Sequence, residues 1–182
     1  IQVSSTLEAI KAIAACYRST LTIPVVGISG SVGKTSTKEM IASILGQHFH
    51  VLKTEGNFNN EIGLPLTSLK VNAETRFLVA EMGANHVGEI ANLTSLVPPD
   101  IAVVLKVGVA HLGEFGSPER IAQAKSEIIR GLVPGGLSVL NANDEHVAAM
   151  SAIAPGDVMW FGLPQNNDGK PAISAQHVHC DE

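Results

Sequence analysis

The chain has 182 residues with a formal net charge of −5, and 45% of these residues are hydrophobic. A chain of this length can form one sizeable domain, and its composition excludes a disordered or fibrous protein. The negative charge argues against a general nucleic-acid binder, because phosphate backbones are held by clustered Lys and Arg. No apolar run reaches the ~20 residues that cross a bilayer, so we expect no membrane span.

The two cysteines, Cys16 and Cys180, lie near opposite ends of the chain and form no closely spaced metal-binding pattern. This usage is typical of a reducing compartment, so we expect a cytoplasmic location. The chain begins with Ile1 rather than Met, and we therefore expect a piece of a longer or processed protein.

Short aliphatic runs alternate with helical patterns along the chain. The first helix is expected to begin at Ser5, whose hydroxyl can cap it while Glu8 reaches back. Several runs are nearly uninterrupted Val, Ile and Leu, as parallel strands buried on both faces require. The predicted fold class is therefore α/β, a doubly wound, mostly parallel sheet with flanking helices. The expected strands are 23–28, 50–54, 76–82, 101–107, 137–141 and 158–161, and the later helices are 34–47, 61–70, 87–96, 118–132 and 144–152.

The chain divides into three parts by the same patterns. Residues 1–21 are predicted to be a lead-in helix and linker, and residues 22–163 the α/β domain. Residues 164–182 are predicted to be a turn-rich loop followed by an edge strand. In doubly wound sheets ligands lie where loops leave the carboxyl ends of the strands, so these loops are the candidate sites.

The stretch GISGSVGKTSTKEM, residues 27–40, follows a strand and opens a helix. Its glycines let backbone amides turn inward at the positive end of the helix, which suits a polyphosphate. Lys34 would hold the β and γ phosphates, and the Thr35 hydroxyl would ligate Mg²⁺. The alternative is a glycine-rich turn, and Ile28 stands where the common phosphate-binding loop (P-loop) has its first glycine. The residues expected to bind nucleotide are Gly30, Ser31, Val32, Gly33, Lys34, Thr35 and Ser36.

Two further residues at strand ends could ligate metal. Glu81 closes the aliphatic strand of RFLVAEMG, where a carboxylate is either a solvated surface group or, beside a phosphate loop, a Mg²⁺ ligand. His111 follows the fourth long strand, in VGVAHLGEFGS, and is either a hydrogen-bonded structural residue or a ligand. Residue type alone does not decide between these alternatives.

Lys125 lies in a helix that Ser117 and Pro118 begin well. At 3.6 residues per turn it falls about 40° from Ile121, inside the apolar stripe of that helix, whereas Glu127 is expected to point away. A lysine in an apolar stripe must find a partner, change its charge, or extend its ammonium group to water.

Four blocks occur in order between about residues 29 and 129: GSVGKTSTKEM, EGNFNNEIGLPLT, EMGANHVGEI and AHLGEFGSPERIAQAKSEI. Together they resemble consecutive signatures of the Mur ligase family. The second and third blocks favour the members that add D-alanyl-D-alanine to UDP-N-acetylmuramoyl-tripeptide. Mur ligases use the short Gly-x-x-Gly-Lys-Thr form of the loop, which accounts for Ile28.

The resemblance implies a role for each matching residue. ATP phosphates would lie on residues 30–35 of the central ATP-binding domain, with one Mg²⁺ held by Thr35 and Glu81 and a second by His111 and Lys125. Lys125 matches a lysine that family members carry as a carbamate, a CO₂ adduct that replaces the cation by an anion. The residues implied to be catalytic are Lys34, Glu81, His111 and Lys125.

The resemblance also implies a substrate surface. Asn57, Asn59 and Asn60 match a segment that faces the UDP-muramoyl substrate, and Asn85 and His86 lie in another matching loop. The alternative for the asparagines is an Asx-type turn that caps the following helix.

The implied reaction is ATP-driven amide synthesis. The γ-phosphoryl group passes to the terminal carboxylate of the peptide precursor, and the amine of D-Ala-D-Ala attacks the resulting acyl phosphate. The family's enzymes have three domains and act in the bacterial cytoplasm, so we expect amino- and carboxy-terminal domains to be missing from this chain and the segment alone to be inactive. The alternatives are a related folylpolyglutamate or cyanophycin synthetase, or a non-catalytic nucleotide-binding fragment.

Overall fold

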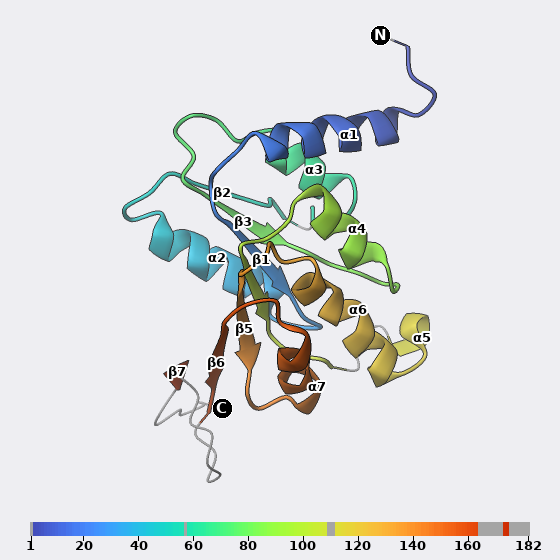
Figure 1. Ribbon diagram of the computed structural model, residues 1–182, viewed down its shortest axis with the longest axis vertical. Coiled ribbons are helices and arrows are strands. Elements are labelled where there is room, and N and C mark those ends of the chain that lie inside the picture. Colours follow the sequence, from blue (N-terminus) through green and yellow to red (C-terminus); the bar gives the residue numbers. More distant parts are fainter. Residues whose placement is uncertain (1, 57, 109–111, 164–172, 175–182) are drawn as a thin grey trace.

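The computed structural model describes residues 2–56, 58–108, 112–163 and 173–174 (Figure 1). Within these residues, seven parallel strands form one sheet in the order β2-β3-β1-β4-β5-β6-β7. This architecture confirms the predicted α/β class with a parallel sheet. The strands are β1 (Val25–Ser29), β2 (Val51–Lys53), β3 (Phe77–Glu81), β4 (Ile101–Val104), β5 (Leu137–Asn141), β6 (Val158–Gly162) and β7 (Ile173–Ser174).

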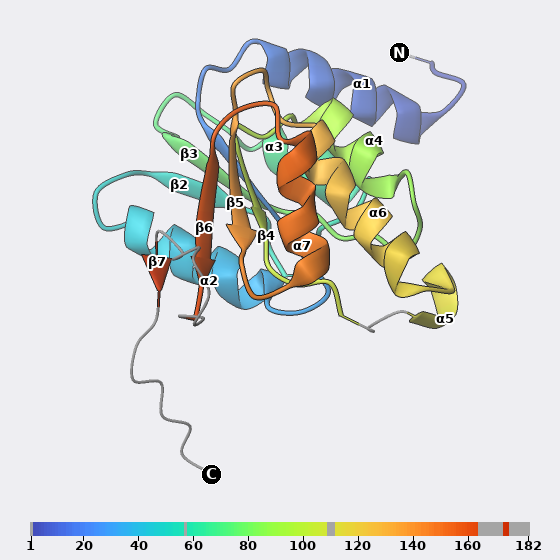
Figure 2. The same cartoon turned by 60° about the horizontal axis from the view of Figure 1, so that its bottom comes forward.

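Helices flank both faces of the sheet, and α2 lies on the face opposite the others (Figure 2). The first helix begins after Ser5 as predicted, and the Ser5 hydroxyl accepts a hydrogen bond from the amide of Glu8 at 3.3 Å. The helices are α1 (Thr6–Ser19), α2 (Lys34–Leu45), α3 (Gly63–Ser68), α4 (Glu89–Leu96), α5 (Leu112–Phe115), α6 (Pro118–Arg130) and α7 (Glu145–Ala149), followed by the 3₁₀ turn η1 (Met150–Ile153).

The central strands are buried on both faces. Because neighbouring residues of a strand point to opposite sides, each strand contributes side chains to two cores. Leu78 and Val104 belong to the larger core, which they form with α3, α4, α6 and α7. Ile28, Val79 and Val103 belong to the second core, on the side of α2. The long aliphatic runs of the sequence are therefore the strands of a sheet that helices cover on both sides.

Several helices end or begin at a glycine, one or two residues away from the boundary predicted from the periodicity of the sequence. Gly46 and Gly131 are the C-caps of α2 and α6, and Gly88, with a φ of 97°, precedes α4. The helix predicted at 144–152 is the two elements α7 and η1. The sequence does not predict α5, because four residues are too few to show a helical period.

β4 ends at Val104, three residues before the predicted end at 107. The following residues leave the sheet because their backbone groups bond elsewhere. The carbonyl of Lys106 accepts a hydrogen bond from the amide of Ser31 at 2.8 Å. The amide of Val107 donates to the carboxylate of Asp144 at 2.9 Å. This segment therefore supports the loop that follows β1.

The lead-in helix α1 packs on α3 and α4 (Figure 1). The Tyr17 hydroxyl donates to the carbonyl of Val71 at 2.6 Å, and the ammonium of Lys11 contacts the carboxylate of Glu61 at 2.5 Å. In the part of the chain that the structure describes, no helix is long and apolar enough to span a membrane.

The loops after β1, β3 and β4 leave the parallel sheet at the same edge. The connection after β1 runs to α2 on one face, whereas the connections after β3 and β4 run to α4 and α6 on the other face (Figure 2). A crevice forms where connections part in this way, and it is the usual ligand site of a doubly wound sheet.

Candidate active site

The glycine-rich loop between β1 and α2 ends in an open helix terminus. Gly33, with a φ of 83°, is the N-cap of α2, and no side chain caps the free amides of the first turn. Gly30 has a φ of 148°, and a Cβ there would lie 3.1 Å from Cβ of Leu105. Because α2 has 12 residues and its first amides lack a side-chain cap, this terminus can bind an anion.

The loop is braced from the segment that follows β4. The amide of Gly108 donates to Oγ of Ser31 at 2.9 Å, and the Ser31 amide bonds to the carbonyl of Lys106. The side chains of Val32 and Ser36 are exposed. The amide and the hydroxyl of Ser31 are thus both bonded to the supporting segment, so Val32 is the residue of this pair that is placed to offer a ligand its backbone amide.

Thr35 and Glu81 lie side by side at the start of α2 and the end of β3. The Thr35 hydroxyl donates to Oε2 of Glu81 at 2.8 Å, and Nδ2 of Asn59 donates to Oε1 at 2.9 Å. Glu81 is 2% exposed, so the alternative of a solvated surface carboxylate is wrong. Oxygens at right angles around Mg²⁺, with bonds of about 2.0–2.1 Å, are about 2.9 Å apart. The hydroxyl and the carboxylate therefore have the spacing of two ligands of one ion.

Two lysines, Lys34 and Lys125, line the same cavity. Nζ of Lys34 donates to the carbonyl of Gly30 at 2.9 Å. Lys125 is 3% exposed, its Nζ donates to the carbonyl of Ala84 at 3.3 Å, and it lies 5.8 Å from the ring centre of Phe115. Burial, together with the positive charge of Lys34, lowers the pKa of Lys125 to about 8. The alternative in which this side chain extends into water is therefore wrong.

These groups meet at a cavity of about 320 Å³ at the carboxyl edge of the sheet. Lys34 comes from α2, Asn59 from the loop after β2, and Lys125 from α6. Glu81 joins this wall through its hydrogen bond with Asn59. The cavity is lined by Gly30, Ser31, Lys34, Asn59, Asn60, Gly83, Ala84, Asn85, Glu89, Phe115 and Lys125.

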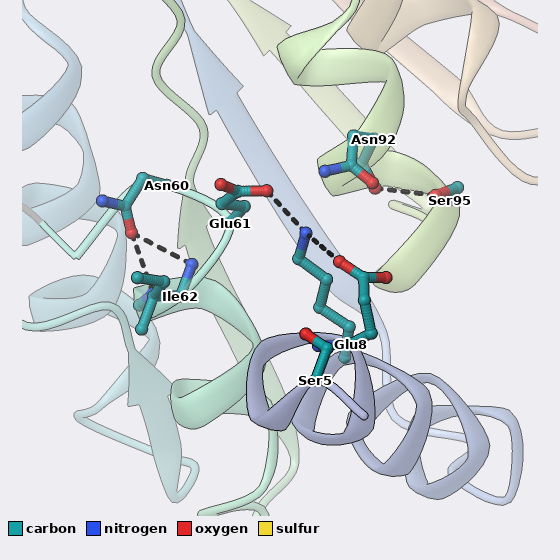
Figure 3. Close-up of polar contacts among 9 residues, drawn as sticks. Ser5, Glu8, Asn60, Glu61, Ile62, Asn92 and Ser95 are labelled. Carbon is teal, nitrogen blue, oxygen red and sulfur yellow. Dashed lines mark hydrogen bonds and ion pairs between the residues drawn. The ribbon is translucent and has the colours of Figure 1, made fainter. Parts of the chain in front are cut away.

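The predicted substrate asparagines Asn59, Asn60 and Asn85 line the cavity. Oδ1 of Asn60 accepts hydrogen bonds from the amides of Ile62, at 3.2 Å, and Gly63, at 2.9 Å, ahead of α3 (Figure 3). The turn-capping alternative thus holds for Asn60, although its side chain also reaches the cavity. For Asn59 the structure shows a different partner, the carboxylate of Glu81.

His86 does not line the cavity. Its exposed ring lies with Nδ1 3.1 Å from Oε1 of Glu89, and the amide of Asn85 donates to Oε2 of Glu89 at 2.7 Å. Asn57 and His111, two further predicted site residues, lie outside the described residues. Within the described ranges, no three His, Cys, Asp or Glu side chains gather as a metal site.

Glu127 is buried, contrary to the prediction that it points away from the apolar stripe. α4 packs beside α6 here, and the Glu127 carboxylate accepts hydrogen bonds from the amides of Gly88, at 2.6 Å, and Ala91, at 2.9 Å. The carboxylate caps a helix that has no capping side chain of its own. It thereby ties the helix of Lys125 to the loop that carries Asn85.

Replacing Glu127 by alanine should lower the free energy of unfolding by about 2 kcal/mol, because two buried amides lose a charged acceptor. Urea unfolding measures the change. Glu74 is exposed, and its replacement by alanine is the matched control, with an expected change within about 0.5 kcal/mol. Equal effects of the two substitutions would show that the cap contributes nothing.

The fold and the cavity define a doubly wound α/β domain with its candidate site at the carboxyl edge of the sheet. Residues 28–181 match the Mur ligase middle domain, and the chain belongs to the Mur ligase family.

Individual relatives agree with this family. The UDP-N-acetylmuramoyl-tripeptide--D-alanyl-D-alanine ligase of Mycobacterium tuberculosis (strain H37Rv) is 44% identical over 160 residues, which are 88% of this chain and 31% of the relative. The corresponding ligase of Escherichia coli (strain K12) is 39% identical over 177 residues, 97% of this chain and 39% of the relative. The chain thus spans about a third of the length of these ligases.

Solved structures of the family superpose closely. The crystal structure of MurF from Acinetobacter baumannii matches with a TM-score of 0.85 at 39% identity, over 89% of this chain and 36% of that protein. MurF ligase from Thermotoga maritima, in complex with ADP, matches with a TM-score of 0.82 at 37% identity, over 89% and 38%. Escherichia coli FolC, a TM-score of 0.66 at 15% identity over 88% and 47%, shares the fold alone.

Proposed function

We propose that this chain is the ATP-binding central part of a ligase that joins D-alanyl-D-alanine to UDP-N-acetylmuramoyl-tripeptide during peptidoglycan precursor synthesis. Its relatives are ligases of that name, and one MurF relative binds ADP. The observation that carries the proposal is one cavity at the start of α2 that Lys34, Lys125 and Asn59 line, with the Glu81 carboxylate bonded to Asn59 and to Thr35 beside it. In this proposal residues 22–163 form the central domain, residues 1–21 lead into it, and residues 164–182 lead out.

The phosphates of ATP would lie on residues 30–36. The free amides at the start of α2 would bind the phosphate oxygens, as helix termini do for anions. Lys34, which lies over the loop on the carbonyl of Gly30, would turn its ammonium to the β and γ phosphates. Its charge stabilises the transferring phosphoryl group, which is the main demand of this reaction on a protein.

Thr35 and Glu81 would hold one Mg²⁺, because their oxygens already have the spacing of neighbouring ligands. When bound, the ion supplies positive charge that neutralises phosphate oxygens. Asn59 keeps the second carboxylate oxygen of Glu81 fixed, so that Oε2 faces Thr35. The Thr35 hydroxyl and the Glu81 carboxylate thus fit Mg²⁺ as two neighbouring oxygen ligands.

Lys125 would carry the carbamate. Only a neutral amine adds CO₂, and with a pKa of about 8 roughly a tenth of Lys125 is neutral at pH 7, against far below a hundredth for an ordinary lysine. The ammonium of Lys34, whose charge disfavours a cation at Lys125, would favour the anionic carbamate. Together with His111, the carbamate would hold a second Mg²⁺.

The tripeptide carboxylate would enter the cavity beside Asn59, Asn60 and Asn85, and Asn57 and His86 would contribute to binding the same substrate. It takes the γ-phosphoryl group to form an acyl phosphate. The amine of D-Ala-D-Ala then attacks the acyl carbon, the amide bond forms, and phosphate leaves. The uridine part of the substrate would be bound by an amino-terminal domain, and the dipeptide by a carboxy-terminal domain.

The test uses the protein at its full natural length with ATP, D-Ala-D-Ala and UDP-N-acetylmuramoyl-tripeptide, and detects product by mass. We expect pentapeptide product and stoichiometric phosphate. Glutamate addition to a folate, with no pentapeptide, would instead indicate a folylpolyglutamate-type ligase. Nucleotide binding without either product would indicate a non-catalytic domain.

A further inference from the structure

Lys38 is fully buried, and the roles proposed above do not use it. It lies one turn after Lys34 on α2 and is 0% exposed. Its Nζ donates to the carbonyl of Gly56 at 3.3 Å and lies 3.3 Å from Oε1 of Glu39. The same Nζ is 3.9 Å from Oε2 of Glu81. A buried ammonium costs free energy unless it is paired, so these contacts determine where the side chain stays.

Glu81 has this ammonium near its Oε2, whereas Asn59 bonds to its Oε1. Its two oxygens accept hydrogen bonds from Thr35 and Asn59, both neutral side chains. Among the described residues, Lys38 is the cation within ion-pair distance of the Glu81 carboxylate. Glu39, the other anion beside Lys38, is half exposed and also pairs with Lys53.

We propose that Lys38 is a positioning residue, the resident counter-ion of Glu81, which makes metal binding at Glu81 depend on bound nucleotide. This inference rests on the proposed function, in which Glu81 ligates Mg²⁺. A divalent cation that binds Oε2 of Glu81 without nucleotide is repelled by the positive charge of Lys38, which lies 3.9 Å from that oxygen, and this repulsion offsets part of the attraction of the carboxylate. The polyphosphate of ATP adds several negative charges, so the metal then binds together with the nucleotide.

Because Lys38 is buried, its side chain cannot move away from Glu81. An exposed lysine would swing away when a metal ion arrives, but Lys38 is fully enclosed and bonded to the carbonyl of Gly56. The bond also ties α2 to the loop that carries Asn59. The site would thus hold Glu81 aimed at Thr35 before any ligand arrives, without storing a metal ion between turnovers.

Titration of Mn²⁺, followed by electron paramagnetic resonance, tests the inference with the full-length protein and no nucleotide. Lys38→Gln and Lys38→Met should each bind Mn²⁺ about tenfold more tightly than the wild type, because the opposing charge is gone. Lys70→Met is the matched control, since Lys70 pairs with exposed Glu55 on the surface, and its Mn²⁺ affinity should equal that of the wild type. A purely structural Lys38 would give weaker binding on replacement, so unchanged or weaker Mn²⁺ binding in the folded Lys38 variants overturns the inference.

A second arm needs no Lys38 variant and so stands even if those variants fail to fold. Mn²⁺ binding to the wild type and to Glu81→Gln is compared with and without a non-hydrolysable ATP analogue. We expect equal, weak binding without the analogue and weaker binding by Glu81→Gln with it. If Glu81→Gln already binds Mn²⁺ more weakly than the wild type without the analogue, the counter-ion role of Lys38 is refuted, but Glu81 remains a metal ligand. No difference with the analogue refutes Glu81 as a metal ligand, and with it the proposed function of this site.

Discussion

Replacing Lys34 by alanine is expected to reduce ligase turnover about a thousandfold or more while the fold is kept. The Nζ of Lys34 bonds only to the carbonyl of Gly30 among its described hydrogen bonds, so its removal costs the fold little. In the reaction the same ammonium would neutralise the transferring phosphoryl group, and losing one such preorganised group typically costs a factor of 10² to 10³, with the loss of a full charge at the upper end. Release of phosphate that depends on D-Ala-D-Ala is the measurement.

Lys70→Ala is the matched control for Lys34→Ala. It removes one lysine from the surface pair with Glu55, outside the cavity, and turnover should stay at the wild-type level. Circular dichroism and thermal unfolding confirm that both variants are folded. Full activity of folded Lys34→Ala would show that the loop does not bind the transferring phosphate.

Replacing Lys125 by alanine should also abolish turnover, but a small carboxylic acid such as acetate should partly restore it. Alanine removes the amine that would carry the carbamate and leaves space beside the ring of Phe115 and the carbonyl of Ala84. Acetate can occupy that space and supply the anionic oxygens, whereas the alanine side chain cannot. The initial rate is measured as the acid concentration rises.

Two comparisons make the rescue specific to the carbamate. Acetate should not restore Lys34→Ala, whose missing group is a cation. Methylammonium should not restore Lys125→Ala if the working form of Lys125 is an anion. Rescue by methylammonium and not by acetate would contradict the carbamate and show that Lys125 acts as an ammonium group.

Most of the fold is predictable from the sequence because its strands are buried on both faces. Residues of β1 and β3 are almost all apolar, so they are visible as strands without knowledge of their neighbours. The end of β4 is not visible in this way. Leu105 and Val107 are as apolar as a strand, but the partners that draw their segment out of the sheet, Ser31 and Asp144, lie far away in the sequence.

The candidate site is predictable where one short stretch carries the geometry. Lys34 and Thr35 follow a strand and a glycine-rich turn, so their position at an open helix terminus follows from local sequence. Glu81 is predictable because it closes a strand, and parallel strands end at a common edge. The partnership of Asn59 with Glu81 is not predictable, since a turn-capping asparagine has the same sequence signature.

The burial of Glu127 and of Lys38 could not be predicted from the sequence. Both are charged residues on amphipathic helices, and a charged residue in such a place is usually on a solvated face. Glu127 is buried because α4 presents uncapped amides to α6. Lys38 is buried because the loop around Gly56 and the end of β3 close over it. These are tertiary contacts, and no periodicity within either helix records them.

The central claim is that this chain forms the ATP-binding centre of a ligase that activates a carboxylate as an acyl phosphate. The most direct measurement uses UDP-N-acetylmuramoyl-tripeptide labelled with oxygen-18 in its terminal carboxylate, together with ATP, D-Ala-D-Ala and the full-length protein. One labelled oxygen should appear in the released phosphate and one should remain in the new amide, because the acyl phosphate breaks between carbon and oxygen when the amine attacks. Pentapeptide formed with unlabelled phosphate would contradict the account.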